Sequence, residues 1–345
     1  MTAGAIPVFD GHNDTLTRED AADFVAGRAG GHLDLPRARA GGLAGGIFAL
    51  FTDTPGYDPP FDHTPDGRLD VDPSPPIGAD VAAPHATAAA GRLLALERDG
   101  HVRLARAPGD LDAARADGVL AAVMHLEGAE AIDPGLEALD LWHAAGLRSL
   151  GPVWSRPNAF GHGVPFAFPA SPDTGPGLTE AGRALVRRCA ELRIAFDLSH
   201  LNEAGFWDVA RLDAAPLIAS HSGAHALSAQ SRNLTDGQLD AIGASGGLVG
   251  IVFAAPFLRG DGRDDADTPL ATLVAHVRYV AARIGVERVG LGSDFDGATM
   301  PAELGDAAGL PRLLAALADD GFDQDEVRAI AWDNWRRVLE RAWGG

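Results

Sequence analysis

The sequence contains no lysine, so all 28 of its basic residues are arginine. This absence excludes a phosphate-binding loop lysine, a Schiff-base lysine and a carboxylated lysine that bridges two metal ions. Any protein group that bridges two metal ions in this chain therefore has to be a carboxylate.

Cysteine is almost absent as well, and no apolar run reaches the length of a membrane span. Cys189 is the single cysteine, so an internal disulfide is excluded, which fits a reducing compartment. It lies in a segment of helical periodicity (181–193), where we expect it to be a small core residue. No basic segment followed by an apolar one stands at the start, so we expect neither a signal peptide nor a membrane span. We therefore expect a cytoplasmic protein.

Positive charge is in short supply. The 28 basic residues stand against 48 acidic ones, which gives a formal net charge of -20. Such a protein repels nucleic-acid phosphates and anionic lipids, so we expect neither nucleic acid nor a membrane as a partner. The 345 residues, 46% of them hydrophobic, are enough to bury a large core.

Short runs rich in Val, Ile, Leu and Phe alternate with longer segments of helical period, which is typical of parallel strands joined by crossover helices. The number of these runs matches the eight strands that a closed (β/α)8 TIM barrel requires. We expect strands at 7–14, 46–51, 120–127, 147–154, 194–200, 216–221, 248–253 and 289–294. We expect helices at 80–98, 110–117, 135–145, 179–192, 203–212, 236–244, 269–284 and 310–318.

A final helix is predicted from an N-cap at Asp323 to about residue 342. It carries Trp332 and Trp335, with Trp343 just beyond, and we expect these tryptophans to pack the helix on the barrel rather than to bind a ligand. The prediction is one domain over residues 1–345, an α/β barrel of the metal-dependent hydrolase type.

Two long loops, at 52–78 and 155–177, are rich in Pro and Gly and each follows the carboxyl end of a predicted strand. Active sites of barrels lie at that end, so we expect these loops to cover an active site. The alternative is that they are surface insertions or dimer contacts.

The run Asp10-Gly11-His12-Asn13-Asp14 ends the first predicted strand. Side chains two residues apart on a strand point the same way, so His12 and Asp14 can offer an imidazole nitrogen and a carboxylate oxygen to one cation. A strand-end pair that merely caps a turn is the simpler alternative.

Four further candidates end other predicted strands: Glu127, His200, His221 and Asp294. The strand ends of a barrel converge on one mouth, so these residues become neighbours of the first pair. Taken singly, His200 is equally well a packed core histidine and Glu127 a turn cap. Taken together, three imidazoles and two carboxylates are enough for two metal ions with one bridging carboxylate. The mixed donors favour two Zn(II) ions, leave Mn(II) or Fe(II) open, and disfavour Mg(II) and Ca(II).

These residues also carry a family resemblance. In order and spacing, and over nearly the whole chain, the motifs resemble the membrane (renal) dipeptidase family of zinc peptidases. The motifs are Asp10-Gly11-His12-Asn13-Asp14, Leu126-Glu127-Gly128, Asp197-Leu198-Ser199-His200, Ala219-Ser220-His221-Ser222, Ser231-Arg232-Asn233 and Gly292-Ser293-Asp294-Phe295-Asp296-Gly297.

The resemblance implies a role for each candidate. Asp294 contacts the attacking water and handles its proton, and Arg232 holds the terminal carboxylate of the substrate. A carboxylate beside an acidified water and a guanidinium fork suit these tasks chemically. The resemblance further implies two zinc ions, one held by His12 and Asp14, the other by His200 and His221, with Glu127 bridging them.

Two positions depart from the family pattern. Members that act on dipeptides place a histidine just after the fourth strand, where it hydrogen-bonds the substrate carbonyl oxygen, and that position falls on Trp154 here. Either the indole Nε1–H of Trp154 donates this bond or Arg156 or His162 takes its place. A tyrosine expected after the seventh strand is missing, with Phe257 nearby.

We therefore predict a binuclear-zinc dipeptidase that cleaves the amide bond of small dipeptides. The resemblance implies that a D-amino acid is accepted at the C-terminus of the substrate, and that the protein forms a homodimer. Within the enzymes, the alternative is hydrolysis of another small amide or lactone, such as an N-acyl amino acid. Outside them, the alternative is a catalytically silent metal-binding scaffold.

Overall fold

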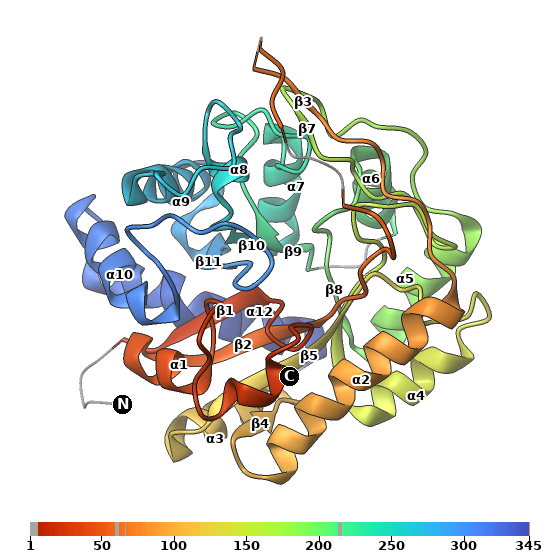
Figure 1. Cartoon of the computed structure of the whole chain (residues 1–345), viewed down its shortest axis with the longest axis horizontal. Coiled ribbons are helices and arrows are strands. Elements are labelled where there is room, and N and C mark those ends of the chain that lie inside the picture. Colours follow the sequence, from red (N-terminus) through yellow and green to blue (C-terminus); the bar gives the residue numbers. More distant parts are fainter. Residues whose placement is uncertain (1–5, 59–61, 66, 213–215, 345) are drawn as a thin grey trace.

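A parallel β-barrel forms the centre of the computed structural model, which describes residues 6–58, 62–65, 67–212 and 216–344. Eight strands follow one another in the order β8-β6-β5-β2-β1-β11-β10-β9, and a parallel bridge between Asp197 and Ile218 joins the two ends of this row. The predicted (β/α)8 barrel is thereby confirmed (Figure 1). The strands are β1 (Val8–Asn13), β2 (Leu43–Leu50), β5 (Leu120–Glu127), β6 (Leu147–Gly151), β8 (Ala195–Phe196), β9 (Ile218–Ser222), β10 (Leu248–Ile251) and β11 (Val289–Leu291).

The helices surround the strands in Figure 1, and all eight crossover helices lie within two residues of their predicted ends. Polar caps explain the boundaries: Thr179 accepts a hydrogen bond from the backbone N–H of Gly182, and Thr235 forms a capping box with Gln238. The crossover helices are α2 (Ala79–Arg98), α3 (Pro108–Asp117), α4 (Glu137–Ala145), α5 (Glu180–Leu192), α6 (Glu203–Arg211), α7 (Asp236–Ser245), α9 (Leu270–Ile284) and α10 (Leu310–Asp319).

Several short elements were not predicted, because each is too brief to show a period. Strand β4 (Val102–Leu104) pairs with the first residues of β5. The other helical pieces are α1 (Leu35–Gly41), α8 (Ala255–Leu258) and the 3-10 turns η1 (Ala21–Phe24), η2 (Val286–Arg288) and η3 (Ala307–Gly309).

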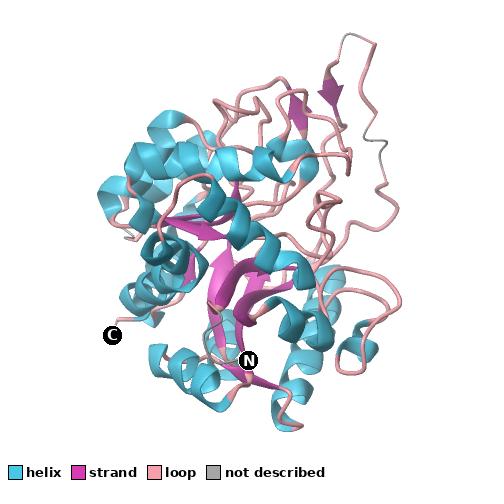
Figure 2. Ribbon diagram, turned by 90° about the vertical axis from the view of Figure 1, so that its left-hand side faces the viewer, coloured by secondary structure: helices cyan, strands magenta, loops and turns pink. Residues whose placement is uncertain are grey.

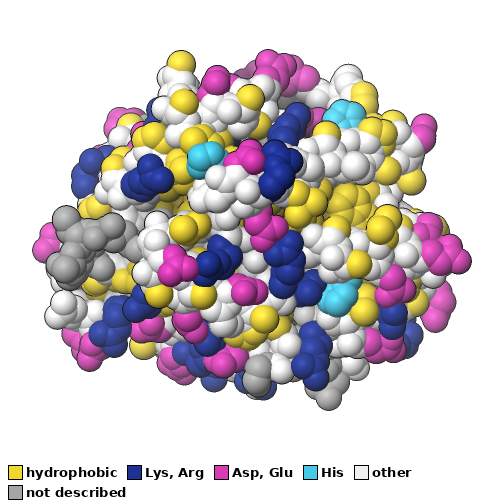
Figure 3. Space-filling view, turned by 90° about the horizontal axis from the view of Figure 1, so that it is seen from below, with side chains coloured by type: hydrophobic (Ala, Val, Ile, Leu, Met, Phe, Trp, Pro, Cys, Tyr) yellow, Lys and Arg dark blue, Asp and Glu magenta, His cyan; other side chains and the backbone are white. Residues whose placement is uncertain are grey.

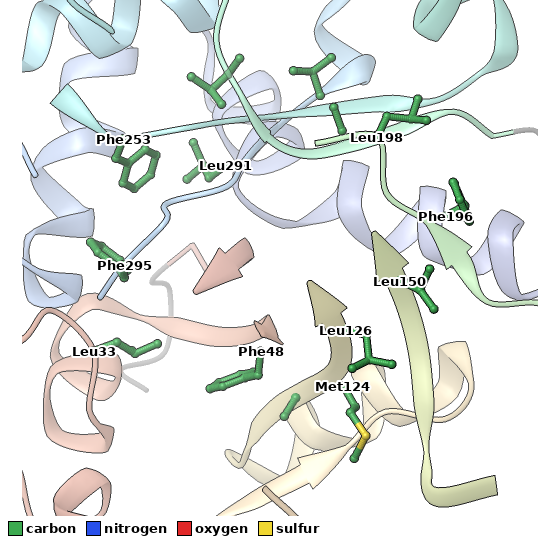
Figure 4. Packing of buried hydrophobic residues seen from close by; sticks show 14 of the residues in the cluster. Leu33, Phe48, Met124, Leu126, Leu150, Phe196, Leu198, Phe253, Leu291 and Phe295 are labelled. Atoms are coloured by element: carbon green, nitrogen blue, oxygen red, sulfur yellow. The ribbon is translucent and has the colours of Figure 1, made fainter. Parts of the chain in front are cut away.

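Side chains of the strands alternate between two apolar clusters. Ala122 and Met124 of β5 pack outward against the helices, in the layer that Figure 4 shows, whereas Ala121 and Val123 point into the barrel. The same alternation turns Glu127, at the end of β5, toward the barrel mouth. In β1 a register shift between Asp10 and Asn13 interrupts the alternation.

The C-terminal segment closes the bottom of the barrel, as expected from its tryptophans. Asp323 caps α11 (Gln324–Arg328), a π-helical turn η4 (Ala329–Asp333) follows, and α12 (Asn334–Trp343) ends the chain's helical part. Trp335 is fully buried against Phe9, and its Nε1–H donates to the carbonyl of Leu291 at 2.8 Å. The final helix is therefore interrupted rather than continuous, and it includes Trp343.

The two long loops meet above the barrel mouth. Within them, β3 (Leu69–Asp70) pairs antiparallel with β7 (Ala167–Phe168), on the side of the molecule where Figure 2 shows the loops gathered. Residues 59–61 and 66 of the first loop lie outside the described residues. The pairing ties the two loops into one cover, as expected for loops over an active site.

The surface at the lower face in Figure 3 mixes arginine and acidic side chains with small apolar areas. Elsewhere in the described chain, exposed charges are paired, as Arg336 is with Asp112 at 2.9 Å. Within the part of the chain that the structure describes, no helix is long and apolar enough to cross a membrane.

Candidate metal centre and substrate cavity

His12, Asp14 and Glu127 form one group of donors at the barrel mouth. His12 lies in β1 and Asp14 follows it directly, and the Nε2 atom of His12 is 3.6 Å from Asp14 Oδ2 and 3.5 Å from Glu127 Oε1. All three side chains are buried. The prediction that His12 and Asp14 project together is met in the structure, although Asp14 itself lies just beyond the strand.

His200 and His221 complete a second group around the same carboxylate. Their Nε2 atoms are 3.0 Å apart and lie 3.0 Å and 3.6 Å from Glu127 Oε1. The other ring nitrogens are held by hydroxyls: Ser155 Oγ is 2.8 Å from His200 Nδ1 and Ser220 Oγ is 2.7 Å from His221 Nδ1. These contacts turn both Nε2 atoms toward Glu127.

One prediction about this group was wrong in detail. His200 does not end a strand: β8 stops at Phe196, and His200 has a left-handed backbone with φ 66°. A residue in that conformation cannot continue a β-strand. The turn from Leu198 to Leu201 carries His200 back over the mouth instead.

The two groups fit divalent metal ions. Ligands about 2.1 Å from a tetrahedral zinc ion lie roughly 3.4 Å from one another, and the donor pairs here are 3.0 to 3.6 Å apart. Both ring nitrogens of His12 and Oδ1 of Asp14 are buried without a hydrogen-bond partner among the described residues, which is costly unless something else binds them. Glu127 belongs to both groups, so two adjacent ions can share it.

Asp197 also lies within ligand distance of His12 and His221. Its oxygens, however, already accept hydrogen bonds from the backbone N–H groups of Ser199 and Ser220 and from the Ser220 hydroxyl. Asp197 therefore orients the strand ends that carry the histidines and is not a free ligand.

The electrostatics of the mouth suit this chemistry. Burial, with Arg232 nearby, lowers the pKa of His200 to about 4, so its imidazole is neutral and able to bind a metal ion. Burial and the neighbouring Asp14 carboxylate raise the pKa of Asp294 to about 7 in the protein alone.

Asp294 lies in the loop after β11 and not at a strand end as predicted. Strand β11 stops at Leu291, and Asp294 has φ 62°, held there by its backbone N–H donating to the carbonyl of His12 at 3.0 Å. Asp296, two residues further along the same motif, pairs with the buried Arg28 at 3.0 Å.

A cavity of about 640 Å³ opens from this cluster toward the two loops. Phe51, Trp154, Phe166 and Phe257 supply aromatic walls, and Leu69 of β3 contributes from the loop cover. Further lining residues are Asp53, Tyr57, Asp58, Gln230 and Asp264, none of which the sequence singled out, because they lie in loops and follow no motif.

Trp154 lines the cavity with its ring 5.9 Å from that of His200, and its Nε1–H has no hydrogen bond to any described residue. Arg156 does not line the cavity: its guanidinium donates to Glu130, Thr54 and the carbonyl of Thr52. His162 turns its Nδ1 toward the carbonyl of Gly177, also away from the cavity. Of the three proposed donors, only Trp154 faces the cavity.

Arg232 is buried behind the cavity wall rather than forming part of it. Its Nη1 donates to Ser222 Oγ at 3.0 Å and its Nη2 to the carbonyl of His221 at 3.1 Å, while its guanidinium lies 5.9 Å from the Phe257 ring. Its Nε–H has no partner among the described residues.

The barrel and its donor cluster define a metal-dependent hydrolase. The profile of the membrane dipeptidase family, peptidase family M19, matches residues 3–343, and the chain belongs to this family. As a member it is a metal-dependent dipeptidase.

Individual relatives and solved structures are similar to the chain over most of its length. The chain is 51% identical over 244 residues to the uncharacterized protein in the pqqA 5'region of Klebsiella pneumoniae, covering 71% of this chain and 90% of that protein. It is similar to the crystal structure of a metallo peptidase from Rhodobacter sphaeroides liganded with a phosphinate mimic of the dipeptide L-Ala-D-Ala, with a TM-score of 0.92, 49% identity and coverage of 98% and 99% of the two chains. It is also similar to dipeptidase AC of family M19, with a TM-score of 0.92, 50% identity and 99% of each chain covered.

Proposed function

We propose that this chain hydrolyses the amide bond of small dipeptides with two zinc ions, one held by His12 and Asp14 and the other by His200 and His221, with Glu127 between them. The observation that carries this proposal is that two donor groups share Glu127 and open onto a cavity of about 640 Å³ with aromatic walls. When bound, the two ions supply an acidified water and polarise the scissile carbonyl group.

The protein groups supply the remaining steps. Asp294 lies beside Asp14 at the cavity and takes a proton from the attacking water, which it then returns to the leaving amine. Trp154 donates its free Nε1–H to the carbonyl oxygen as negative charge develops there. Arg232 binds the terminal carboxylate from behind Phe257 through its Nε–H, which has no partner among the described residues.

We further propose that a D-residue is accepted at the C-terminus of the dipeptide. The support is the Rhodobacter sphaeroides metallo peptidase, which is 49% identical and is liganded with a mimic of L-Ala-D-Ala. The aromatic walls formed by Trp154, Phe166 and Phe257 favour apolar side chains next to the scissile bond.

Metal analysis paired with a substrate screen tests this function. We expect two zinc ions per chain and turnover of L,L and L,D dipeptides well above that of N-acyl amino acids and lactones. Robust activity on N-acyl amino acids or lactones with background rates on every dipeptide would reject the proposed substrate. A single ion per fully loaded chain would reject the shared role of Glu127.

A further inference from the structure

Arg28 connects the two segments that carry Asp14 and Asp294. Its side chain is fully buried, and its Nη2 donates to the backbone carbonyl of Thr15, the residue after Asp14, at 2.7 Å. Its Nη1 lies 2.7 Å from Thr15 Oγ1 and 3.0 Å from an oxygen of Asp296, which follows Asp294 in the same loop. One buried cation therefore binds both of the segments that bring a carboxylate to the metal centre.

The loop after β11 depends on contacts of this kind because its backbone is strained. Asp294 and Asp296 have φ values of 62° and 71°, in a region that residues with a side chain rarely adopt. Such conformations persist where surrounding contacts impose them. Both carboxylate oxygens of Asp296 are engaged, Oδ2 by Arg28 and Oδ1 by the backbone N–H of His32 at 2.6 Å. The backbone N–H of Asp296 donates in turn to His32 Nδ1 at 3.0 Å, so the loop is fixed on both sides of this residue.

The carboxylate of Asp294 has to be placed accurately, because it lies close to that of Asp14. A Cβ atom on Gly297 would lie 2.6 Å from Asp294 Oδ1 and closer still to Asp14 Oδ2, so the two carboxylates converge on this glycine. Two carboxylates this close repel each other when both are charged, and a cation bound to both segments opposes their separation. A displacement of about 1 Å at a reacting group costs about 100-fold in rate.

We propose that the ion pair of Arg28 and Asp296 positions Asp294 for proton transfer. Arg28 is not among the described residues that line the cavity, and its Nη1 also lies 2.9 Å from the carbonyl of Leu33. Asp296 does line the cavity, but its side chain is fully buried and both of its oxygens are engaged. Both are therefore positioning residues, which act through Asp294. This inference rests on the proposed dipeptidase function.

Two substitutions weaken this arrangement to different degrees. Asp296→Asn keeps the size of the side chain but leaves Arg28 buried without its counter-charge, which destabilises a fold as well as loosening the loop. Thr15→Val keeps both charges and removes only the hydroxyl that Arg28 contacts, so it carries the test if Asp296→Asn does not fold. Asp306→Asn is the matched control, because Asp306 pairs with Arg37 at 2.9 Å and is not among the described residues that line the cavity.

Each zinc-loaded variant is assayed on an L,D dipeptide, and its zinc content is measured. We expect Asp296→Asn to lower kcat about 10- to 100-fold while KM stays within about threefold, because the group that transfers the proton is displaced and the substrate contacts are not. Thr15→Val should lower kcat by about 3- to 10-fold, as for the loss of one hydrogen bond. The zinc content of both variants, and every parameter of Asp306→Asn, should match wild type.

A double-mutant cycle with Asp294→Asn separates positioning from a general loss of stability. Once the Asp294 carboxylate is gone its position no longer matters, so Asp296→Asn, or Thr15→Val in its place, should change the residual kcat by less than about threefold in that background. Residual product is quantified by chromatography.

Losses in kcat that multiply in the double variant would overturn the proposal, as would losses confined to KM or to zinc content. A wild type that hydrolyses no dipeptide would reject the proposed function and this inference with it. An active wild type in which Asp296→Asn and Thr15→Val both keep the wild-type kcat would reject only the positioning role.

Discussion

The proposed role of Asp294 in proton transfer can be tested by a substitution of nearly equal size. Asp294→Asn keeps the size and position of the side chain but removes the carboxylate, so kcat should fall by about 100- to 10,000-fold, the range for a lost general acid or base. Zinc content, measured by plasma mass spectrometry, should remain near two ions per chain. Asp53→Asn, at the exposed rim of the same cavity, is the control. An unchanged kcat for Asp294→Asn would show that another group carries the proton.

The hydroxyl behind His200 should matter for metal affinity. Ser155→Ala removes the partner of His200 Nδ1, frees the ring to rotate, and should weaken zinc binding at that site by about 10- to 100-fold. Ser149→Ala is a close control, since Ser149 Oγ bonds the Nδ1 of His125, a buried histidine outside the two donor groups that share Glu127. Zinc titration against a competing chelator measures both. Equal losses in the two variants would indicate a general effect of destabilisation.

At the scale of elements, helix α9 carries a histidine that has to stay neutral. The backbone N–H of Ala224 donates to His276 Nδ1, and His276 Nε2 donates to the carbonyl of Leu258, each at 3.0 Å. Protonation of Nδ1 breaks the first bond. Burial accordingly lowers the pKa of His276 from 6.5 to about 4.

This lowered pKa predicts a pH dependence of stability. His276 is protonated below about pH 6.5 in the unfolded chain but only below about pH 4 in the folded chain. The free energy of unfolding is therefore highest above pH 6.5 and decreases as the pH falls toward 4. At pH 8 the His276→Gln variant should have a lower free energy of unfolding than wild type. This difference should be smaller by roughly 2 kcal/mol at pH 5. Urea unfolding at the two pH values measures it. Parallel pH profiles for the two proteins would contradict the prediction.

Strand β11 and helix α12 pack so closely at Gly290 that only glycine fits there. A Cβ atom on Gly290 would lie 2.5 Å from Trp335 Nε1 and 3.2 Å from Leu248 Cδ2, and the three atoms nearest to it all belong to side chains. Gly290→Ala should destabilise the fold by about 1–3 kcal/mol through overpacking. Trp335→Ala should cost about 3–5 kcal/mol through the cavity it leaves.

A double-mutant cycle separates these two effects. In the Trp335→Ala background the Trp335 atoms that Gly290→Ala would strike are gone, so the double variant should be less destabilised than the sum of the single variants. Denaturant unfolding of the four proteins provides the comparison. Strict additivity would show that Gly290 is required for a reason other than the tryptophan.

At the scale of the whole molecule, metal binding should contribute to folding stability. The cluster buries several carboxylates and imidazoles with unpartnered atoms, and these assemble only in the folded chain. Zinc at about 1,000 times its Kd should therefore add about 4 kcal/mol per bound ion to the free energy of unfolding over chelated protein. Magnesium at the same concentration should add little, because it binds nitrogen donors poorly. Equal stability with and without zinc would contradict a site built for metal ions.

Much of the fold could be predicted from the sequence because local signals define it. Strand and helix periods placed the barrel elements, and the predicted N-cap at Asp323 marked the start of the C-terminal helical segment. The residues expected at the mouth do meet there, since the order of strands in a barrel brings their ends together. Strand lengths were less predictable: His200 and Asp294 have left-handed backbones that depend on contacts with distant loops.

The amino-acid sequence by itself determined the class of fold, the family and the set of donors offered to metal ions, because periodicity and motif spacing are local properties of the chain. Only the tertiary structure decided which donors are free and which are already used. Asp197 and Arg156 are occupied by protein partners, whereas His12 and Gln230 keep buried atoms without one. The physical reason is that hydrogen-bond satisfaction depends on neighbours from other parts of the chain, such as Ser220 for Asp197 and Glu130 for Arg156, which come together only when the barrel closes.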